Sequence, residues 1–310
     1  MSKPTSRILL LGKNGQVGWE LQRSLAPLGD VIGFDIGDEY RHGEQVLRGD
    51  LTDLEGLRKT IQSIRPQVIV NAAAYTAVDR AEEERELAAL INAEAPAVLA
   101  EEARALGALL VHYSTDYVYD GSGATAWQEV SPTGPLNHYG ASKLAGDQAI
   151  QASGCKHLIF RTSWVYGARG ANFLATMARL IRQRDALQVI DDQIGVPTGA
   201  ELLADVTAHA IRSVQVDPAL EGLYHLSAAG ETSWHGYATF IAEWLQEQGI
   251  EIQATPDRIA PIPTAKWPTP AQRPLNSRLD TGKLERAFGL VMPHWQQGVA
   301  RVLQERHETT

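Results

Sequence analysis

The sequence has a single cysteine, Cys155, among its 310 residues, so no disulfide can form within the chain. Such chains are typical of a reducing compartment, and we expect a cytoplasmic protein. Cys155 lies just before an expected strand, where a buried, inert thiol is the ordinary interpretation. No apolar run approaches the roughly 20 residues needed to cross a bilayer. The first residues also lack an apolar signal core, so we expect neither a membrane segment nor a secretory signal.

Positive charge is also scarce. The formal net charge is −9, which argues against a nucleic-acid partner, because nucleic-acid phosphates require a basic surface. The nine histidines show no H-x-x-x-H spacing, so we expect no catalytic metal. An anionic cofactor or substrate would therefore have to be held by backbone N–H groups or by a few local cations.

Short apolar runs alternate with longer helical patterns, which is typical of βαβ units. The predicted fold class is α/β, a Rossmann-type doubly wound parallel sheet with a smaller C-terminal substrate-binding lobe. The expected domains are residues 1–165, which would bind NAD(P) and carry the catalytic pair, and residues 166–310, mainly the lobe, of which some segments can return to the sheet. The expected strands, the last of which should close the parallel set, are residues 8–11, 31–34, 68–70, 109–113 and 158–161.

A glycine loop directly follows the first expected strand. Gly12, Gly15 and Gly18 allow a tight turn and a close approach of the backbone to a pyrophosphate, at the start of a helix. An ordinary glycine-rich turn has the same composition, but the position after a strand favours a dinucleotide. Asp35, at the end of the second strand, would accept hydrogen bonds from the adenosine ribose and so favours NADH, although a nearby cation would admit NADPH. Asp50, which we place at the end of a third strand, should meet the adenine.

Tyr139 and Lys143 are four residues apart, which places them on one face of a helix. A ketone reduced by hydride needs a proton, and a tyrosine can supply it if a nearby ammonium lowers its pKa. The hydroxyl of Thr115, after the strand at 109–113, could bond both the substrate oxygen and the tyrosine. Each residue alone fits a solvated helix face or a turn, but together with the glycine loop they predict an oxidoreductase.

Two further residues have open roles. Trp164 follows the last expected strand, where it would form either an apolar wall for the substrate or part of the core. Arg273, within the proline-rich residues 256–274, would either pair with a diphosphate or lie on the surface.

With these motifs the sequence resembles the extended short-chain dehydrogenase/reductases and, among them, the group that reduces dTDP-4-dehydrorhamnose. The most specific stretches are residues 111–118 and 160–166, and the resemblance covers nearly the whole chain. It implies hydride transfer from NADPH or NADH to C4 of dTDP-4-dehydro-β-L-rhamnose, with Tyr139 as proton donor, Thr115 as its hydroxyl partner and Lys143 as electrostatic support. It also implies a homodimer.

The resemblance implies individual contacts as well. Substrate contacts would be made by Thr115, Asp116, Tyr139 and Trp164. A structural Mg²⁺ near the dimer interface would be bound by Glu20, Glu201 and Glu305. From the sequence alone, these three glutamates would simply lie on the surface. The implied cofactor contacts, beside Gly12, Tyr139 and Lys143, are Gly15, Gln16, Val17, Asp35, Asp50, Leu51, Ala74, Tyr75 and Thr76.

Two other functions stay open. The first is another nucleotide-sugar enzyme, an epimerase or a 4,6-dehydratase, but a dehydratase needs a glutamate after the Thr-Asp pair, and here Tyr117 follows Thr115-Asp116. The second is a non-catalytic regulatory subunit that keeps the dinucleotide site. Stoichiometric consumption of reduced cofactor would separate a reductase from both.

Overall fold

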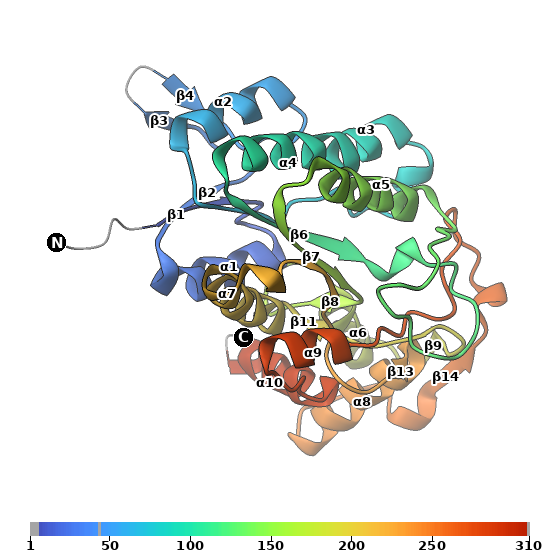
Figure 1. The fold of residues 1–310 in the computed structure, drawn as a ribbon. Coiled ribbons are helices and arrows are strands. Elements are labelled where there is room, and N and C mark those ends of the chain that lie inside the picture. The colour runs from blue at the N-terminus through green and yellow to red at the C-terminus, as the bar shows by residue number, and fades with distance from the viewer. Residues whose placement is uncertain (1–5, 43–44, 309–310) are drawn as a thin grey trace.

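The computed structural model describes residues 6–42 and 45–308. Its centre is a six-stranded parallel sheet with the strand order β12-β7-β6-β5-β1-β2 (Figure 1). The five strands expected from the sequence are all present, and the Rossmann-type fold class is confirmed. The strands are β1 (Arg7–Leu11), β2 (Asp30–Phe34), β5 (Val68–Asn71), β6 (Leu109–Thr115), β7 (Lys156–Thr162) and β12 (Gly222–His225).

The strand at 158–161 does not close the sheet, so that expectation was wrong. The edge beyond it is β12, which pairs in parallel with β7 and sets Leu223 opposite Ile159. β12 reads Gly-Leu-Tyr-His, which lacks the continuous apolar run that marks the equally short β5.

The placement of Asp50 at the end of a third sheet strand was wrong as well. The chain after β2 forms a separate antiparallel hairpin, β3 (Tyr40–His42) and β4 (Gln45–Leu47). Asp50 therefore follows the hairpin and precedes helix α2 (Leu54–Ile64).

Strand alternation separates the two faces of the sheet. Along β1, Ile8 and Leu10 belong to the core on one face, and Leu9 and Leu11 to the core on the other. Both faces are covered, so β1, β5, β6 and β7 each contain a continuous apolar run, with polar residues at one or both strand ends. Figure 1 shows α2, α4 (Ala95–Leu106) and α5 (His138–Ser153) on one face, and α1 (Gln16–Leu25) and α7 (Ala200–Val216) on the other.

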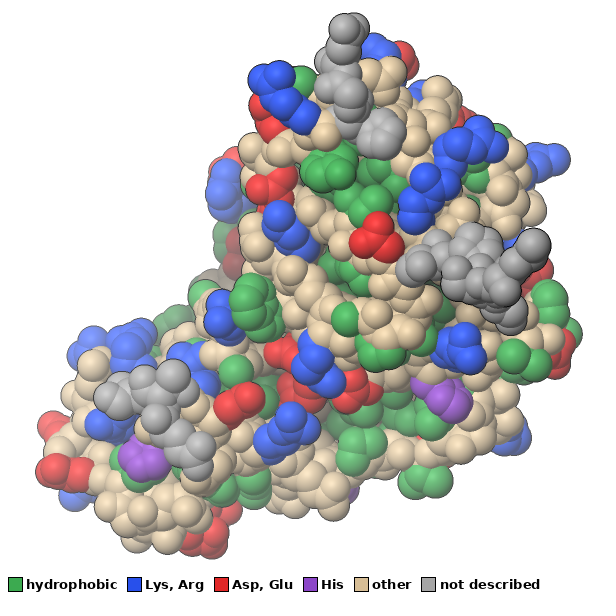
Figure 2. Space-filling model, turned by 90° about the vertical axis from the view of Figure 1, so that its left-hand side faces the viewer, with side chains coloured by type: hydrophobic (Ala, Val, Ile, Leu, Met, Phe, Trp, Pro, Cys, Tyr) green, Lys and Arg blue, Asp and Glu red, His purple; other side chains and the backbone are tan. Residues whose placement is uncertain are grey.

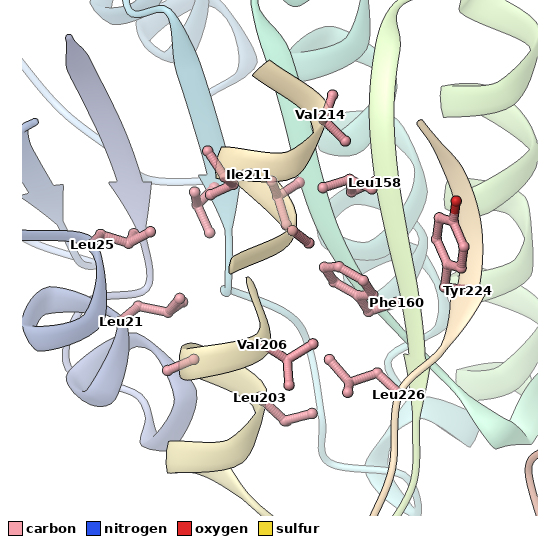
Figure 3. Close-up of a cluster of buried hydrophobic side chains, with 14 of the residues drawn as sticks. Leu21, Leu25, Leu158, Phe160, Leu203, Val206, Ile211, Val214, Tyr224 and Leu226 are labelled. Atoms are coloured by element: carbon pink, nitrogen blue, oxygen red, sulfur yellow. The ribbon is translucent and has the colours of Figure 1, made fainter. Parts of the chain in front are cut away.

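Helix α7 lies far along the chain but packs on the sheet itself (Figure 3). Its Leu203, Val206 and Ile211 meet side chains of α1 and of β7, among them Leu21 and Phe160. The short helix α9 (Gly282–Phe288) adds to the same core. The expected C-terminal lobe thus contributes several segments to the sheet layer.

A third core belongs to the C-terminal lobe alone. It is built on the apolar faces of α6 (Phe173–Gln183), α8 (Trp234–Glu247) and α10 (Trp295–Glu308), beside the parallel pair β9 (Leu187–Ile190) and β14 (Ile259–Ile262). Four two-residue strands form two further pairs, in which β8 (Val165–Tyr166) lies beside β11 (Thr198–Gly199) and β10 (Ile194–Gly195) beside β13 (Thr232–Ser233).

The surface agrees with the charge balance of the sequence. The face in Figure 2 carries lysine and arginine side chains interspersed with aspartates and glutamates, with no continuous basic area. Within residues 6–42 and 45–308, no helix is long and apolar enough to cross a membrane.

Replacing Leu203 by alanine tests whether α7 belongs to the sheet core. Leu203 is fully buried, so we expect Leu203→Ala to lower the free energy of unfolding by about 2–5 kcal/mol. Val216 ends the same helix but is 83% exposed, and Val216→Ala should change stability by less than about 0.5 kcal/mol. Urea unfolding followed by circular dichroism measures both; equal effects would contradict this packing.

Candidate active site

The glycine loop is shaped by close backbone contacts at the carboxyl edge of the sheet. Gly12 has φ +81°, and a Cβ there would lie 2.7 Å from the backbone nitrogen of Ala73. A Cβ on Gly18 would lie 1.9 Å from the carbonyl oxygen of Gly12. Gly15 caps α1 without a side-chain bond, so the first N–H groups of the helix have no side-chain cap. These features fit a loop that receives a pyrophosphate.

The end of β2 is bonded to this loop. The backbone N–H groups of Gly12 and Lys13 both donate to the carbonyl of Phe34, at 2.8 and 3.2 Å. The N–H of Asn14 donates to Asp35 Oδ2 at 2.8 Å. The structure therefore brings Asp35 against the glycine loop, where the ribose of a dinucleotide would lie.

The other expected cofactor residues are held by neighbouring segments. Asp50 Oδ1 accepts bonds from the backbone and hydroxyl of Thr52, and Leu51 is buried in the core. The side chain of Gln16 accepts a bond from Asn172, the N-cap of α6, which ties the glycine loop to the lobe. Val17 packs against the core under α1.

Ala74, Tyr75 and Thr76 follow β5, and this segment is fixed by a residue that the sequence analysis missed. Asn92 accepts from the backbone N–H of Tyr75 at 2.9 Å and donates to its carbonyl at 3.0 Å. It also donates to Ser142 Oγ at 3.0 Å. The phenol of Tyr75 donates to Glu84 instead, so Tyr75 is bonded to Asn92 through its backbone alone.

Asn92 lies in an irregular stretch of helix between β5 and β6. The structure has α3 (Arg85–Ala89), a π-helical turn (Leu90–Glu94) and then α4. Pro96 has no N–H to give to the carbonyl of Asn92, four residues earlier. A Cβ on Gly146 of α5 would lie 2.2 Å from that carbonyl oxygen, so the two helices touch here. An asparagine four residues before a proline was the only signal in the sequence.

Thr115 and Tyr139 are brought together as expected. Thr115 ends β6 and caps a short 3-10 helix (Asp116–Val118), while Tyr139 lies in the first turn of α5. A hydrogen bond with Thr115 lowers the pKa of Tyr139, but burial has the larger effect and raises the pKa overall. The expected lowering of the Tyr139 pKa by Lys143 is therefore not what this structure shows.

Lys143 is buried and directed at the sheet. Its Nζ donates to the carbonyl of Tyr113 at 2.6 Å and lies 3.1 Å from His112 Nε2. Asn71 Oδ1 accepts the N–H of Ala73, so the NH₂ group of the Asn71 amide faces His112 Nδ1 and donates to it. A neutral imidazole that accepts at Nδ1 carries its proton on Nε2, the nitrogen that faces Lys143. Such an N–H disfavours an ammonium. In the same direction, burial lowers the pKa of Lys143 to about 8, although the charge of Asp147 opposes the shift.

An ion pair lies beneath these residues. Asp147 of α5 and Arg161 of β7 are buried, with Arg161 Nε 3.0 Å from Asp147 Oδ2. Ser114 donates to the same carboxylate at 2.9 Å, and Arg161 donates to the hydroxyl of Tyr119 at 2.8 Å. Because a buried charge without its partner is costly, this network fixes α5 against β6 and β7.

Asp116 is buried beside Thr115. Its Oδ1 accepts the Thr115 hydroxyl at 3.1 Å, and in the described part of the chain its buried Oδ2 has no partner. Burial raises the pKa of Asp116 to about 6, and the neighbouring hydroxyls of Ser277 and Thr115 oppose the shift. A ligand that enters here would meet a carboxyl oxygen ready to form a hydrogen bond.

Trp164 has a strained backbone. Its φ of +45° is unusual for a side chain larger than glycine, and such strain is common at ligand sites. Its ring stacks on Trp234 with centroids 3.6 Å apart, and Gly195 lies on its edge, where a Cβ would come within 2.8 Å. Trp164 is partly exposed. Its buried part belongs to the core, and its exposed part is open to a substrate.

Arg273 has an acidic partner on another segment. Its Nη2 lies 2.8 Å from Asp79 Oδ2, and Asp79 also accepts the N–H of Ala271. Burial raises the pKa of Tyr117, and the charge of Arg273 opposes that shift. The Tyr117 ring packs edge-on against Tyr139 with centroids 5.7 Å apart. The proline-rich segment thus brings a cation toward Tyr139.

The three glutamates expected to bind Mg²⁺ lie near one another without forming a metal site. Burial raises the pKa of Glu201. The charges of Glu20 and Glu305 add to this shift, and the charge of Arg301 opposes it. In the described part of the chain, however, no group of three or more His, Cys, Asp or Glu side chains is placed to hold a metal ion. One chain alone therefore does not fit the ion.

Comparisons with known proteins agree on one family. The family model described as the RmlD substrate binding domain matches residues 6–308. The dTDP-4-dehydrorhamnose reductase of Escherichia coli K12 is 53% identical over 303 residues, covering 98% of this chain and 99% of the relative. That of Burkholderia thailandensis is 45% identical, covering 96% and 98%.

Solved structures give the same result. A dTDP-4-dehydrorhamnose reductase from Bacillus anthracis, in complex with NADP, is 35% identical with a TM-score of 0.83, covering 97% of this chain and 99% of that one. A UDP-glucose 4-epimerase from Thermus thermophilus, with NAD, has a TM-score of 0.78 at 23% identity, covering 98% and 100%. The second likeness shows the fold alone.

The lowered pKa of Lys143 can be measured directly. We expect one lysine to lose its proton as the pH rises through about 8, where unperturbed lysines keep theirs to about 10.4. The ammonium is then the main form below this pH and the amine above it. Carbon NMR of labelled lysine Cε would follow the titration, and Lys143→Arg would assign the signal by removing it. A spectrum in which every lysine titrates near 10 would contradict the burial argument.

Proposed function

The chain belongs to the RmlD substrate binding domain family, as do dTDP-4-dehydrorhamnose reductases, and we propose that it reduces C4 of dTDP-4-dehydro-β-L-rhamnose to give dTDP-β-L-rhamnose. It is an NAD(P)-dependent oxidoreductase. The observation that carries the proposal is the position of Tyr139, in the first turn of α5, against the segment of Thr115 at the sheet edge that also holds the glycine loop.

The residues present fit a dinucleotide. Gly12 and Gly18 have no room for a side chain, the start of α1 offers N–H groups, and Asp35 lies against the loop. Bound NADPH or NADH would supply the hydride. The segment Ala74 to Thr76, fixed by Asn92, offers the far half of the cofactor a rigid backbone.

Tyr139 supplies the proton in this proposal. Burial raises its pKa, so the phenol is protonated before reduction and can donate to the oxygen at C4 as charge develops there. The Thr115 hydroxyl, whose proton goes to Asp116 Oδ1 here, would turn in the complex to donate to that oxygen. Lys143 Nζ donates to the Tyr113 carbonyl here; in the complex its ammonium would turn to stabilise the phenolate left behind, and it can hold ribose hydroxyls.

Three residues around this centre are assigned to the substrate. Asp116 has a buried carboxyl oxygen without a partner in the described part of the chain, suited to a sugar hydroxyl. Trp164 offers an apolar ring face to the deoxysugar or base. Arg273 would share its charge between Asp79 and the diphosphate.

The rival functions differ in what they need at the site. A 4,6-dehydratase requires a second acid after the Thr-Asp pair, and Tyr117 stands there. A regulatory subunit needs only the dinucleotide site, whereas this chain also keeps Tyr139, Thr115 and a buried Lys143. Reduction is thus the function that uses every group in the site.

Assembly and location extend the proposal. Two copies of the chain would form a homodimer in the cytoplasm, where a single thiol needs no oxidising compartment. Glu20, Glu201 and Glu305 would lie near the contact, and Mg²⁺ would bind there only if a second copy completed the site.

Purified protein should oxidise NADPH or NADH in one-to-one ratio with added dTDP-4-dehydro-β-L-rhamnose. We expect Tyr139→Phe to lower kcat by about 10²–10⁴-fold, because the proton donor is lost, while cofactor binding stays nearly unchanged. Loss of the absorbance of the reduced nicotinamide measures the rate. Tyr117→Phe removes the neighbouring phenol and should cost far less.

Two results would contradict the proposal. If the reduced cofactor is not oxidised when the dTDP-sugar is added, while UDP- or GDP-linked ketosugars are consumed, the substrate assignment is wrong. A wild-type rate in Tyr139→Phe would remove Tyr139 as the proton donor and leave the substrate assignment standing.

Chelation separates assembly from chemistry. EDTA should leave the hydride-transfer rate of each chain unchanged, because within residues 6–42 and 45–308 no cluster of metal-binding side chains lies at the sheet edge. Light scattering after gel filtration would report the expected dimer in the same samples. A loss of turnover in EDTA while the dimer persists would show that a metal takes part in the reaction.

A further inference from the structure

Lys13 is the one cation of the glycine loop, and its side chain lies along β2. A Cβ on Gly33 would come within 3.1 Å of Lys13 Cδ and 3.2 Å of its Cβ, so the lysine stem covers this glycine. The Lys13 backbone is fixed at both ends, since its N–H donates to Phe34 and its carbonyl accepts from Gln22 Nε2 at 2.8 Å. The ammonium is therefore carried toward the end of β2.

There the ammonium meets Asp38. Lys13 Nζ lies 2.8 Å from Asp38 Oδ2, and the bond from Lys13 is the main reason why the pKa of Asp38 is lowered. The same Oδ2 accepts the backbone N–H of Asp35 at 2.7 Å. Lys13 and the backbone of Asp35 are thus two donors to a single oxygen, which keeps the ammonium beside Asp35.

The carboxylate of Asp35 is fixed independently. Its Oδ2 accepts from Asn14 N–H at 2.8 Å and its Oδ1 from Ile36 N–H at 2.8 Å. One small turn therefore holds two carboxylates and one ammonium, a net charge of about −1. Neutral ribose hydroxyls suit such a turn, whereas a 2′-phosphate would be repelled unless the ammonium turned to it.

We propose that Lys13 receives the 2′-phosphate of NADPH and that its ion pair with Asp38 limits the preference for NADPH over NADH. This inference rests on the proposed function, because it concerns the choice of hydride donor. With NADH the ion pair stays closed and Asp35 accepts the ribose. With NADPH the flexible lysine shares its charge between Asp38 and the phosphate. The side chains of Lys13 and Asp38 are 28% and 35% exposed, so a small ligand group can reach both.

Binding of NADP⁺ and NAD⁺ to the full chain, by calorimetry without a sugar substrate, tests the inference. Lys13→Met keeps an unbranched apolar stem over Gly33 and removes the charge. It should weaken NADP⁺ binding by about tenfold, the loss of a charge-assisted phosphate contact, and leave NAD⁺ within about twofold. Lys59→Met removes another exposed lysine, paired with Glu55 on α2, and is the control for a general change of charge.

Asp38→Asn tests the other half of the pair. The amide oxygen can still accept the Asp35 N–H, so the turn is kept while Lys13 is released. NADP⁺ should bind about threefold more tightly, with NAD⁺ unchanged. In Lys13→Met the same substitution should gain less, because no ammonium is left to release. Adenosine 2′,5′-bisphosphate and adenosine 5′-monophosphate, as probes, should show the same contrast as the two dinucleotides.

The possible failures are distinct. If neither dinucleotide binds the wild-type chain, both the proposed function and this inference are overturned. If both bind but Lys13→Met weakens them equally, or changes neither, Lys13 does not read the 2′-phosphate and only the inference fails. A gain in NADP⁺ affinity from Asp38→Asn that is just as large without Lys13 would show a simple loss of repulsion and would overturn the role of the ion pair.

Discussion

The close contact between α5 and the π-helical turn at Leu90–Glu94 is the constraint on which the site depends. Gly146 lets the carbonyl of Asn92 approach the helix backbone to a distance that any side chain would prevent. From this position the Asn92 amide reaches Ser142 on α5 and both backbone groups of Tyr75. One residue thus sets the distance between the helix of Tyr139 and the segment after β5, where a cofactor would pass.

A second glycine acts at the start of the same helix. A Cβ on Gly140 would lie 2.2 Å from the carbonyl oxygen of Tyr117, so the first turn of α5 rests directly on the segment after Thr115. Asn137 caps this turn through Gly140 N–H and donates to the carbonyl of Gln272 in the proline-rich segment. The helix is therefore fixed at its start and at its middle, and the side chain of Tyr139 has little freedom to leave Thr115.

The sequence was sufficient for features whose signal is local. The five apolar strands and the glycine loop each show a continuous pattern of a few residues, and Tyr139 and Lys143 are related by helical spacing alone. β12 and Asn92 have no such pattern, because their roles come from partners about 60 residues away in one case and on two separate segments in the other. The direction of Lys143 was also beyond prediction, because its partners, the ring of His112 and the carbonyl of Tyr113, lie on another element, β6.

The energetic cost of the site bears on what the chain does. Lys143 is 2% exposed with a pKa lowered to about 8, and Asp147 and Arg161 are buried beneath it. Burying such groups generally costs stability compared with an apolar core of the same volume, and the left-handed backbone of Trp164 adds strain. A protein that only bound a dinucleotide would need the glycine loop and Asp35, but not these buried charged groups. That the costs are concentrated around Tyr139 and Thr115 favours proton transfer at this edge over a purely regulatory role.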